Sequence, residues 1–276
     1  MVTRALLLLA AACSSKAHPD GVGSSGAGSA IVAGSGSAGS GLAGSGSASS
    51  GSAGSSRPAG PTHGEIQIRV EWADVPMAAR ASPGRTPCNT PRAPSVAPTT
   101  TWGIPDAVVI VEDARADPAE PRIVLAECAL SPRVAIGASL VVESAADRPT
   151  SVTLSRRADL PKLASPAPGG AAPRVLRLPI AGHAVAVSLD AGGVYELATA
   201  DKDPEIAWIV APPPGAAIAA TDATGQAVLH GVSPGAHAVT AWLPPRAGQP
   251  ARIARGTVTV APGALAELSL PLTPVP

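Results

Sequence analysis

From residue 63 onward, apolar and polar residues alternate in short runs that are separated by turn-forming residues. Ile66, Ile68 and Val70 alternate with polar neighbours, which is the period-two pattern of a half-buried β-strand. Similar short runs follow at 107–111, 122–126, 134–136, 139–142, 151–154, 174–180, 184–189 and 195–199. This spacing predicts an all-β fold, an antiparallel β-sandwich or barrel, in which the Pro-rich residues 74–101 form a long loop.

A second and shorter series occupies residues 212–276. Asp222 can accept a hydrogen bond from the backbone two residues on, and Gly225 can take a positive φ. Pro234 and Gly235 make a second turn, between runs at 227–230 and 236–242. Alternation at 253–260 and 264–272 adds two more strands. We therefore expect a small C-terminal β-sandwich module at 212–276, after a main sandwich at 63–211.

Residues 14–62 carry no such pattern. Residues 21–60 are almost wholly Gly, Ser and Ala, and a segment of this composition buries too little surface to offset its ordering entropy. We expect a disordered tether with a reach of about 35 Å. Two matches to G-x-G-x-x-G, at 34–39 and 39–44, lie inside this tract. Since no strand precedes them and no helix follows, they are chance matches and not a dinucleotide site.

The first thirteen residues have the features of a secretory signal. Arg4 supplies a positive charge, an apolar run follows, and Cys13 comes after small residues. The run LLLLAAAC resembles the lipobox of bacterial lipoproteins, although Ala10 stands where Leu is usual. The resemblance implies that 1–13 is a lipoprotein signal peptide and that Cys13 is acylated, anchoring the chain to a membrane of the cell envelope. An ordinary signal peptide is the alternative. Ser14, where inner-membrane lipoproteins carry Asp, favours the outer membrane, facing the periplasm or the cell surface.

Composition excludes some partners. The chain has 20 basic and 20 acidic residues and therefore no net charge, and it has no long Lys/Arg run, so we expect no nucleic-acid binding. Aromatic residues make up 2% of the chain, too few for stacking platforms for bases or sugars. Trp208 and Trp242 follow strand patterns and are predicted to pack in a core or between domains.

Cys88 and Cys128 are the two cysteines that remain when Cys13 is set aside. In an exported domain such a pair most often forms a disulfide, which here would attach the long loop to the end of a strand. A thiolate metal or redox site is the alternative. Neither cysteine has a C-x-x-C partner or a nearby His, so the sequence favours the structural bridge.

Residues 103–210 resemble the cupredoxin-like proteins of the methylamine-utilisation and plastocyanin-like type. The resemblance lies in the segments GIPDAVVIVEDARADPAEPRIVLAECALSPRV, GASLVVESAADRPTSVTLS and GGVYELATADKDPEIAWIVAPP. That family has an Asn-x-Asp turn leading to a His, and later a Cys-Asp-x-His-Pro-x-Met hairpin. In copper-binding members, the two His, the hairpin Cys and the Met hold the metal, as a blue-copper site requires.

The ligand residues of that family are replaced in this sequence. The first His falls among residues 150–152, which are Thr, Ser and Val. In the hairpin, Ala200 stands for Cys, Asp203 for His and Ile206 for Met. The resemblance thus implies a cupredoxin-like scaffold with a degenerate copper site and no cofactor. Carboxylates at 201, 203 and 205 could serve a Ca²⁺ ion, but Lys202 and Pro204 interrupt them and favour a solvated loop tip.

The run from Thr221 to Trp242 resembles the carboxypeptidase-regulatory-like, transthyretin-like repeat, with its T-D-x-x-G and V-x-P-G turns. Such modules are accessory and not catalytic. His230 and His237 flank the second turn and raise the question of a metal site. His237 shares parity with Val239, which favours a packed strand residue, and His230 should then point to the opposite face.

These observations together predict a protein that is not an enzyme. No G-x-S-x-G motif occurs, and no nucleophile can be paired with a base. We expect a lipid-anchored cell-envelope protein with a structural or protein-binding role, whose partner is not specified by the sequence. A periplasmic copper-binding or electron-transfer protein with unusual ligands is the alternative.

Overall fold

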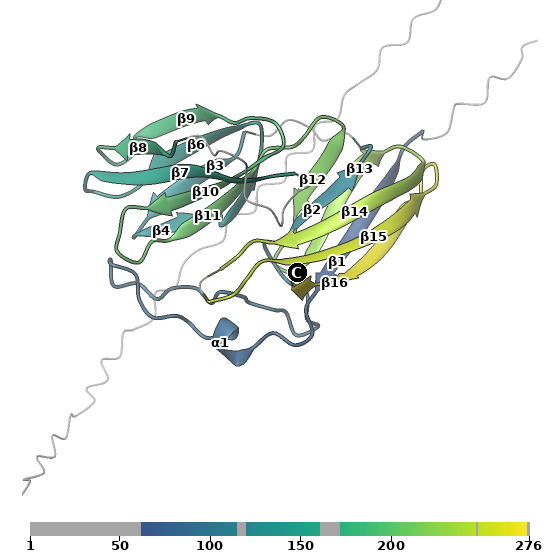
Figure 1. Cartoon of the computed structure of the whole chain (residues 1–276), viewed down its shortest axis with the longest axis horizontal. Helices are drawn as coiled ribbons and strands as arrows, with labels where there is room; N and C mark the ends of the chain where they lie inside the picture. The colour runs from purple at the N-terminus through teal and green to yellow at the C-terminus, as the bar shows by residue number, and fades with distance from the viewer. Residues whose placement is uncertain (1–61, 115–119, 161–171, 247, 275–276) are drawn as a thin grey trace, which may run out of the picture. The chain divides into compact units, whose positions relative to one another are not determined.

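The computed structural model (Figure 1) describes residues 62–114, 120–160, 172–246 and 248–274, and almost every regular element in these ranges is a strand. The exception is α1 (Met77–Arg80). The predicted all-β class is thereby confirmed. The predictions for the signal segment 1–13, for Cys13 and for the tether up to residue 61 lie outside the described residues. Within the described ranges, no helix has the length and apolar character needed to cross a bilayer.

Four sheets hold these strands. Sheet A has the order β13–β1–β16, sheet B β12–β2–β14–β15–β17, sheet C β5–β11–β10–β7–β8, and sheet D β4–β3–β6–β9. The strands of sheets A and B are β13 (Gln226–Val232), β1 (Gly64–Glu71), β16 (Leu265–Pro271), β12 (Ala216–Ala220), β2 (Val108–Glu112), β14 (Gly235–Leu243), β15 (Arg252–Val260) and β17 (Thr273–Pro274). Those of sheets C and D are β5 (Val134–Ile136), β11 (Ile206–Val210), β10 (Gly193–Thr199), β7 (Thr150–Asp159), β8 (Arg174–Leu178), β4 (Ala129–Ser131), β3 (Arg122–Ala126), β6 (Ser139–Ser144) and β9 (Ala184–Ser188).

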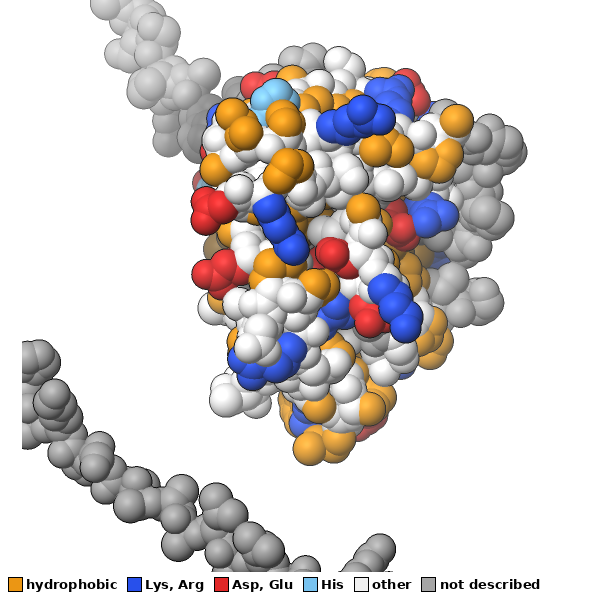
Figure 2. All heavy atoms as spheres, turned by 90° about the vertical axis from the view of Figure 1, so that its left-hand side faces the viewer, with side chains coloured by type: hydrophobic (Ala, Val, Ile, Leu, Met, Phe, Trp, Pro, Cys, Tyr) orange, Lys and Arg blue, Asp and Glu red, His pale blue; other side chains and the backbone are white. Residues whose placement is uncertain are grey.

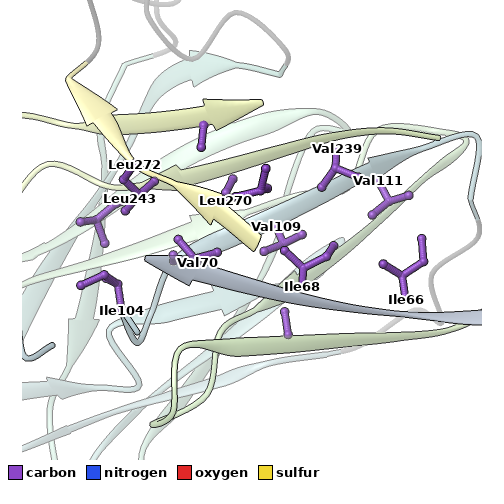
Figure 3. Packing of buried hydrophobic residues seen from close by; sticks show 14 of the residues in the cluster. Ile66, Ile68, Val70, Ile104, Val109, Val111, Val239, Leu243, Leu270 and Leu272 are labelled. Atoms are coloured by element: carbon purple, nitrogen blue, oxygen red, sulfur yellow. The ribbon is translucent and has the colours of Figure 1, made fainter. Parts of the chain in front are cut away.

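Sheets A and B form one sandwich, here the C-terminal sandwich, and its core depends on strand β1. The side chains of Ile66, Ile68 and Val70 are fully buried, as their alternation predicts, and they meet residues of β2 and β14 such as Val109 and Val239 (Figure 3). Burying aliphatic side chains in this way is the main favourable contribution to folding.

Strands from the beginning of the chain therefore complete the C-terminal sandwich. β1 pairs antiparallel with β13 and parallel with β16, and β2 pairs with both β12 and β14. The predicted division into domains at 63–211 and 212–276 assigns β1 and β2 to the first domain, whereas in the structure they pair with strands of the second. Period-two alternation shows which face of a strand is buried but not which strand lies beside it, and the pairing follows from tertiary packing.

The turns predicted near the C-terminus are formed, with one difference. Asp222 accepts hydrogen bonds at its Oδ1 atom from the Thr224 hydroxyl and from the backbone N–H groups of Thr224 and Gln226. The hydroxyl bond first, and the backbone bonds after it, hold the pKa of Asp222 below its usual value. Gly225 has a φ of 80°. Pro234 and Gly235, however, connect β13 in sheet A to β14 in sheet B, so this turn joins the two layers of the sandwich and does not close a hairpin.

Sheets C and D form the second sandwich, here the central sandwich, with its own core of buried residues that include Ile123, Leu140, Leu178 and Leu197. A third cluster joins sheet B to sheet C. In it, Trp208 of β11 and Trp242 of β14 pack edge to face, with ring centroids 5.6 Å apart. Edge-to-face packing is a favoured arrangement of aromatic rings, and the predicted packing role of both tryptophans is confirmed.

The long loop at 74–101 contacts both sandwiches. Val75, Ala79 and Val96 belong to the core of the C-terminal sandwich, so this Pro-rich segment contributes more to a core than its polar composition suggests. Its middle part lies against the β10–β11 hairpin of the central sandwich, through Arg92. The candidate functional site lies where this loop meets the hairpin.

Candidate functional site

The β10–β11 hairpin contains the three positions that the cupredoxin resemblance assigns to lost copper ligands. The hairpin is closed by a backbone hydrogen bond from Thr199 N–H to the Glu205 carbonyl and by a bond from Glu205 N–H to the Thr199 hydroxyl, each 3.0 Å. Ala200 is exposed and lines an open depression, whereas Ile206 lines a separate cavity. These two positions therefore face different surroundings.

One part of the resemblance is consistent with the geometry. Residues 150–152 at the start of β7 lie beside the end of β10, where Thr199 is paired with Val152. Thr150 and Ser151 line the same depression as Ala200. The structure thus places the position of the first His next to that of the hairpin Cys, but the residues found there are hydroxyl and methyl side chains, which do not form a blue-copper site.

Arg92 of the long loop holds the tip of this hairpin. Its Nε lies 3.1 Å from Glu205 Oε1, and its Nη2 donates a 2.7 Å hydrogen bond to the carbonyl of Asp203. Both the Arg92 and the Glu205 side chain are 16% exposed, so water screens this ion pair less than a surface pair. The Glu205 carboxylate is therefore engaged with a cation from the chain itself, and we call this contact the Arg92 latch.

A disulfide attaches the same loop a few residues earlier. Cys88 and Cys128 are bonded, with Cα atoms 5.6 Å apart, which confirms the predicted bridge. Arg148 Nη2 lies 3.0 Å from the sulfur of Cys128. The loop is thus fixed to the central sandwich by a covalent bond at Cys88 and by the Arg92 latch.

Other residues of the loop, namely Pro83, Arg92, Ala93 and Ser95, form one wall of a cavity of about 80 Å³. Its other walls come from the start of β11, from Arg133 before β5, and from the segment after β14 that contains Arg246. The lining residues are Pro83, Arg92, Ala93, Ser95, Arg133, Pro204, Glu205, Ile206, Trp208, Pro245 and Arg246. Because three of them are arginines, we call it the arginine pocket.

Each arginine is held by specific contacts. Arg133 donates to the carbonyls of Pro94 and Ala93, at 2.8 and 3.1 Å. Arg246 approaches Asp106, at 3.6 Å from its carboxylate. Burial lowers the pKa of Arg246, the charge of Arg133 lowers it further, and Asp106 acts in the opposite direction. Because guanidinium groups keep their proton near neutral pH, this site offers fixed positive charge and N–H donors, not proton transfer.

The two histidines that flank the Pro234–Gly235 turn have different surroundings and share no hydrogen-bond partner that is described. His237 is 4% exposed, and its ring nitrogens face the carbonyls of Glu112 and Ser233. His230 is on the surface, where its Nδ1 lies 2.9 Å from Glu65 Oε1. The prediction of a packed His237 and an outward His230 is confirmed. In the described ranges, no three His, Cys, Asp or Glu side chains are grouped as metal ligands would be.

Sequence reasoning missed the arginine pocket. Arg92, Arg133 and Arg246 all follow a proline in a connecting segment, but so do Arg122 and Arg174. The Pro-Arg pair therefore does not single out the pocket residues, and no alternation marks them because they lie outside the strands. The signal that identifies them is spatial.

Comparisons with known proteins leave the chain without an assigned family. No protein-family model, no curated protein and no solved structure matches it. The resemblances to cupredoxin-like and carboxypeptidase-regulatory-like proteins accordingly remain predictions.

Proposed function

We propose that this protein is a non-catalytic, lipid-anchored scaffold of the cell envelope that presents a β-sandwich unit to a protein partner. The observation that carries the proposal is the Arg92 latch. The hairpin that would hold copper in a cupredoxin is engaged here in a contact that fixes a loop. A scaffold with its loops fixed in this way is suited to binding, because ordered loops lose little entropy on association.

The anchor and the tether are inferred from residues 1–62, and the mode of partner binding from the sheet edges. β8 is an edge strand of sheet C, and Val175 on it is 61% exposed. An exposed edge can pair with an extended segment of another chain. The face in Figure 2 carries basic and acidic side chains interspersed with small groups of hydrophobic ones, and a mixed surface of this kind suits a protein partner.

Replacing Cys13 tests the anchor. Expressed in a bacterial host, the full chain should fractionate with membranes and incorporate a labelled fatty acid. Cys13→Ser should lose both properties, because the thiol is the acylated atom. Ser15→Ala is the matched control, since it changes a residue close to Cys13 but leaves the thiol in place, and it should stay in the membrane fraction. Label retained by Cys13→Ser would contradict the proposal.

A copper titration tests the loss of the metal site. The purified protein should retain only substoichiometric copper after dialysis and show no intense visible absorption, because hydroxyl and methyl groups do not replace thiolate and imidazole ligands. The double variant His230→Ala/His237→Ala should give the same result. One copper bound per chain with a thiolate absorption band would instead support an electron-transfer role.

A further inference from the structure

The arginine pocket brings together three positive charges from distant parts of the chain. Arg92 comes from the long loop, Arg133 from the segment between β4 and β5, and Arg246 from the segment between β14 and β15. Like charges repel, and burial increases the repulsion because the surroundings are less polarisable than water. An arrangement of this kind needs compensating negative charge.

The described residues supply only part of that compensation. Among the described residues, Glu205 is the one carboxylate that lines the cavity, and it is engaged by Arg92 at 3.1 Å. Asp106 approaches Arg246 from outside the lining. Arg133 donates to two backbone carbonyls, and none of its described contacts is to a carboxylate. Among the described residues, three positive charges thus face two carboxylates, one paired with Arg92 and one with Arg246, and Arg133 has none.

Arg246 has the clearest unused binding capacity. Its side chain is 10% exposed, yet among the described residues its Nε, itself buried, has no hydrogen-bond partner. The contacts of its Nη2 with Asp106 are long, 3.5 Å to the carbonyl and 3.6 Å to the carboxylate. A buried guanidinium normally uses most of its five N–H donors, because an unpaired buried donor is costly. The Arg246 side chain therefore has donors available for a ligand.

We propose that the arginine pocket binds a small oxyanion of the phosphate class, held by Arg246 and Arg133 beside the indole of Trp208. Guanidinium groups donate paired N–H bonds that match the oxygens of phosphate. A cavity of about 80 Å³ exceeds the roughly 10–15 Å³ that one water needs, so a small anion has room in it. This inference adds a ligand site to the proposed scaffold and does not depend on its partner or anchor.

The test is calorimetric titration of the purified full-length protein with inorganic phosphate, in chloride buffer at constant ionic strength. We expect saturable one-to-one binding. Arg246→Gln should weaken it about tenfold or more, because a charge-assisted hydrogen bond is lost. Arg255→Gln is the matched control. Arg255 is an exposed arginine on β15, away from the pocket, and its replacement should leave the affinity unchanged.

Glu205→Gln provides a variant with the opposite expected sign. The amide oxygen can still accept from Arg92, so the loop stays in place while the side chain at position 205 loses its charge. Phosphate should then bind several-fold more tightly. If Arg246→Gln fails to fold, as judged by circular dichroism, Glu205→Gln alone tests the proposal. Unchanged or weaker binding by Glu205→Gln overturns the proposal.

Two further outcomes would overturn it: no saturable binding by the wild-type protein, or equal losses in Arg246→Gln and Arg255→Gln. Glycerol phosphate distinguishes the possible sources of the anion. If it binds as tightly as inorganic phosphate, the site takes the phosphate group of a larger molecule. If only inorganic phosphate binds, the site takes the free ion.

Discussion

Residues 212–276 expressed alone will remain unfolded, whereas residues 55–276 will fold as one cooperative unit. The isolated segment lacks β1, which is the middle strand of sheet A, and without it β13 and β16 have no partner in that sheet. It also lacks the three fully buried side chains of β1, Ile66, Ile68 and Val70. Each contributes about 2 kcal/mol on burial, about 6 kcal/mol together, which is comparable with the whole net stability of a domain. Circular dichroism and amide chemical-shift dispersion would distinguish the two states.

A matched pair of substitutions in residues 55–276 tests the same point without truncation. Ile68 is fully buried in β1, and Val228 on the adjacent strand β13 is 44% exposed. Ile68→Ala should lower the free energy of unfolding by about 2–5 kcal/mol, and Val228→Ala should change it by less than about 0.5 kcal/mol. Cooperative unfolding of residues 212–276 alone, or equal effects of the two substitutions, would show that β1 is dispensable.

Strand positions could be predicted from the sequence because they depend on local alternation. The runs expected at 122–126 and 184–189 are β3 (Arg122–Ala126) and β9 (Ala184–Ser188) in the structure. Strand partners could not be predicted in the same way, because two strands of period two show the same pattern whichever sheet holds them. The assignment of β1 and β2 to the C-terminal sandwich is therefore a tertiary result.

The candidate site, too, could be predicted from the sequence only in part. The Cys88–Cys128 bridge was predictable because an exported chain with two remaining cysteines has one obvious pairing. The Arg92 latch was not, because it joins a residue of an irregular loop to a hairpin carboxylate, and nothing local marks either one. The tip carboxylates were expected to be solvated, yet Glu205 is largely buried against Arg92.

The long loop connects the core of the C-terminal sandwich to the disulfide and to the Arg92 latch. Its two ends contribute Val75, Ala79 and Val96 to the core of the C-terminal sandwich, while Cys88 and Arg92 attach its middle to the central sandwich. Displacing the middle of the loop would also move one wall of the arginine pocket. Stability and anion binding should therefore respond to the same substitutions.

Removing the disulfide will have the second large effect. In residues 55–276, Cys88→Ser/Cys128→Ser should lower the free energy of unfolding by about 4 kcal/mol, because the bridge spans 40 residues and a crosslink of that length removes much conformational freedom from the unfolded chain. Urea unfolding would measure the change. The reduced wild-type protein is the control and should match the double variant. A difference below about 1 kcal/mol between oxidised and reduced protein would mean that the loop is ordered without the bridge.

The same variant tests whether the two attachments of the loop cooperate. With the disulfide intact, Arg92 is held close to Glu205, so the ion pair forms without a large further loss of loop entropy. Without the disulfide, the ion pair must itself order the loop, and Arg92→Gln should then cost less than it does in the oxidised protein. A double-mutant cycle should give an interaction energy of about 0.5 kcal/mol or more. Phosphate affinity should fall in the double-serine variant, because the loop carbonyls of Ala93 and Pro94 that hold Arg133 are then less firmly fixed. Strict additivity together with unchanged phosphate binding would show that the loop has no part in shaping the pocket.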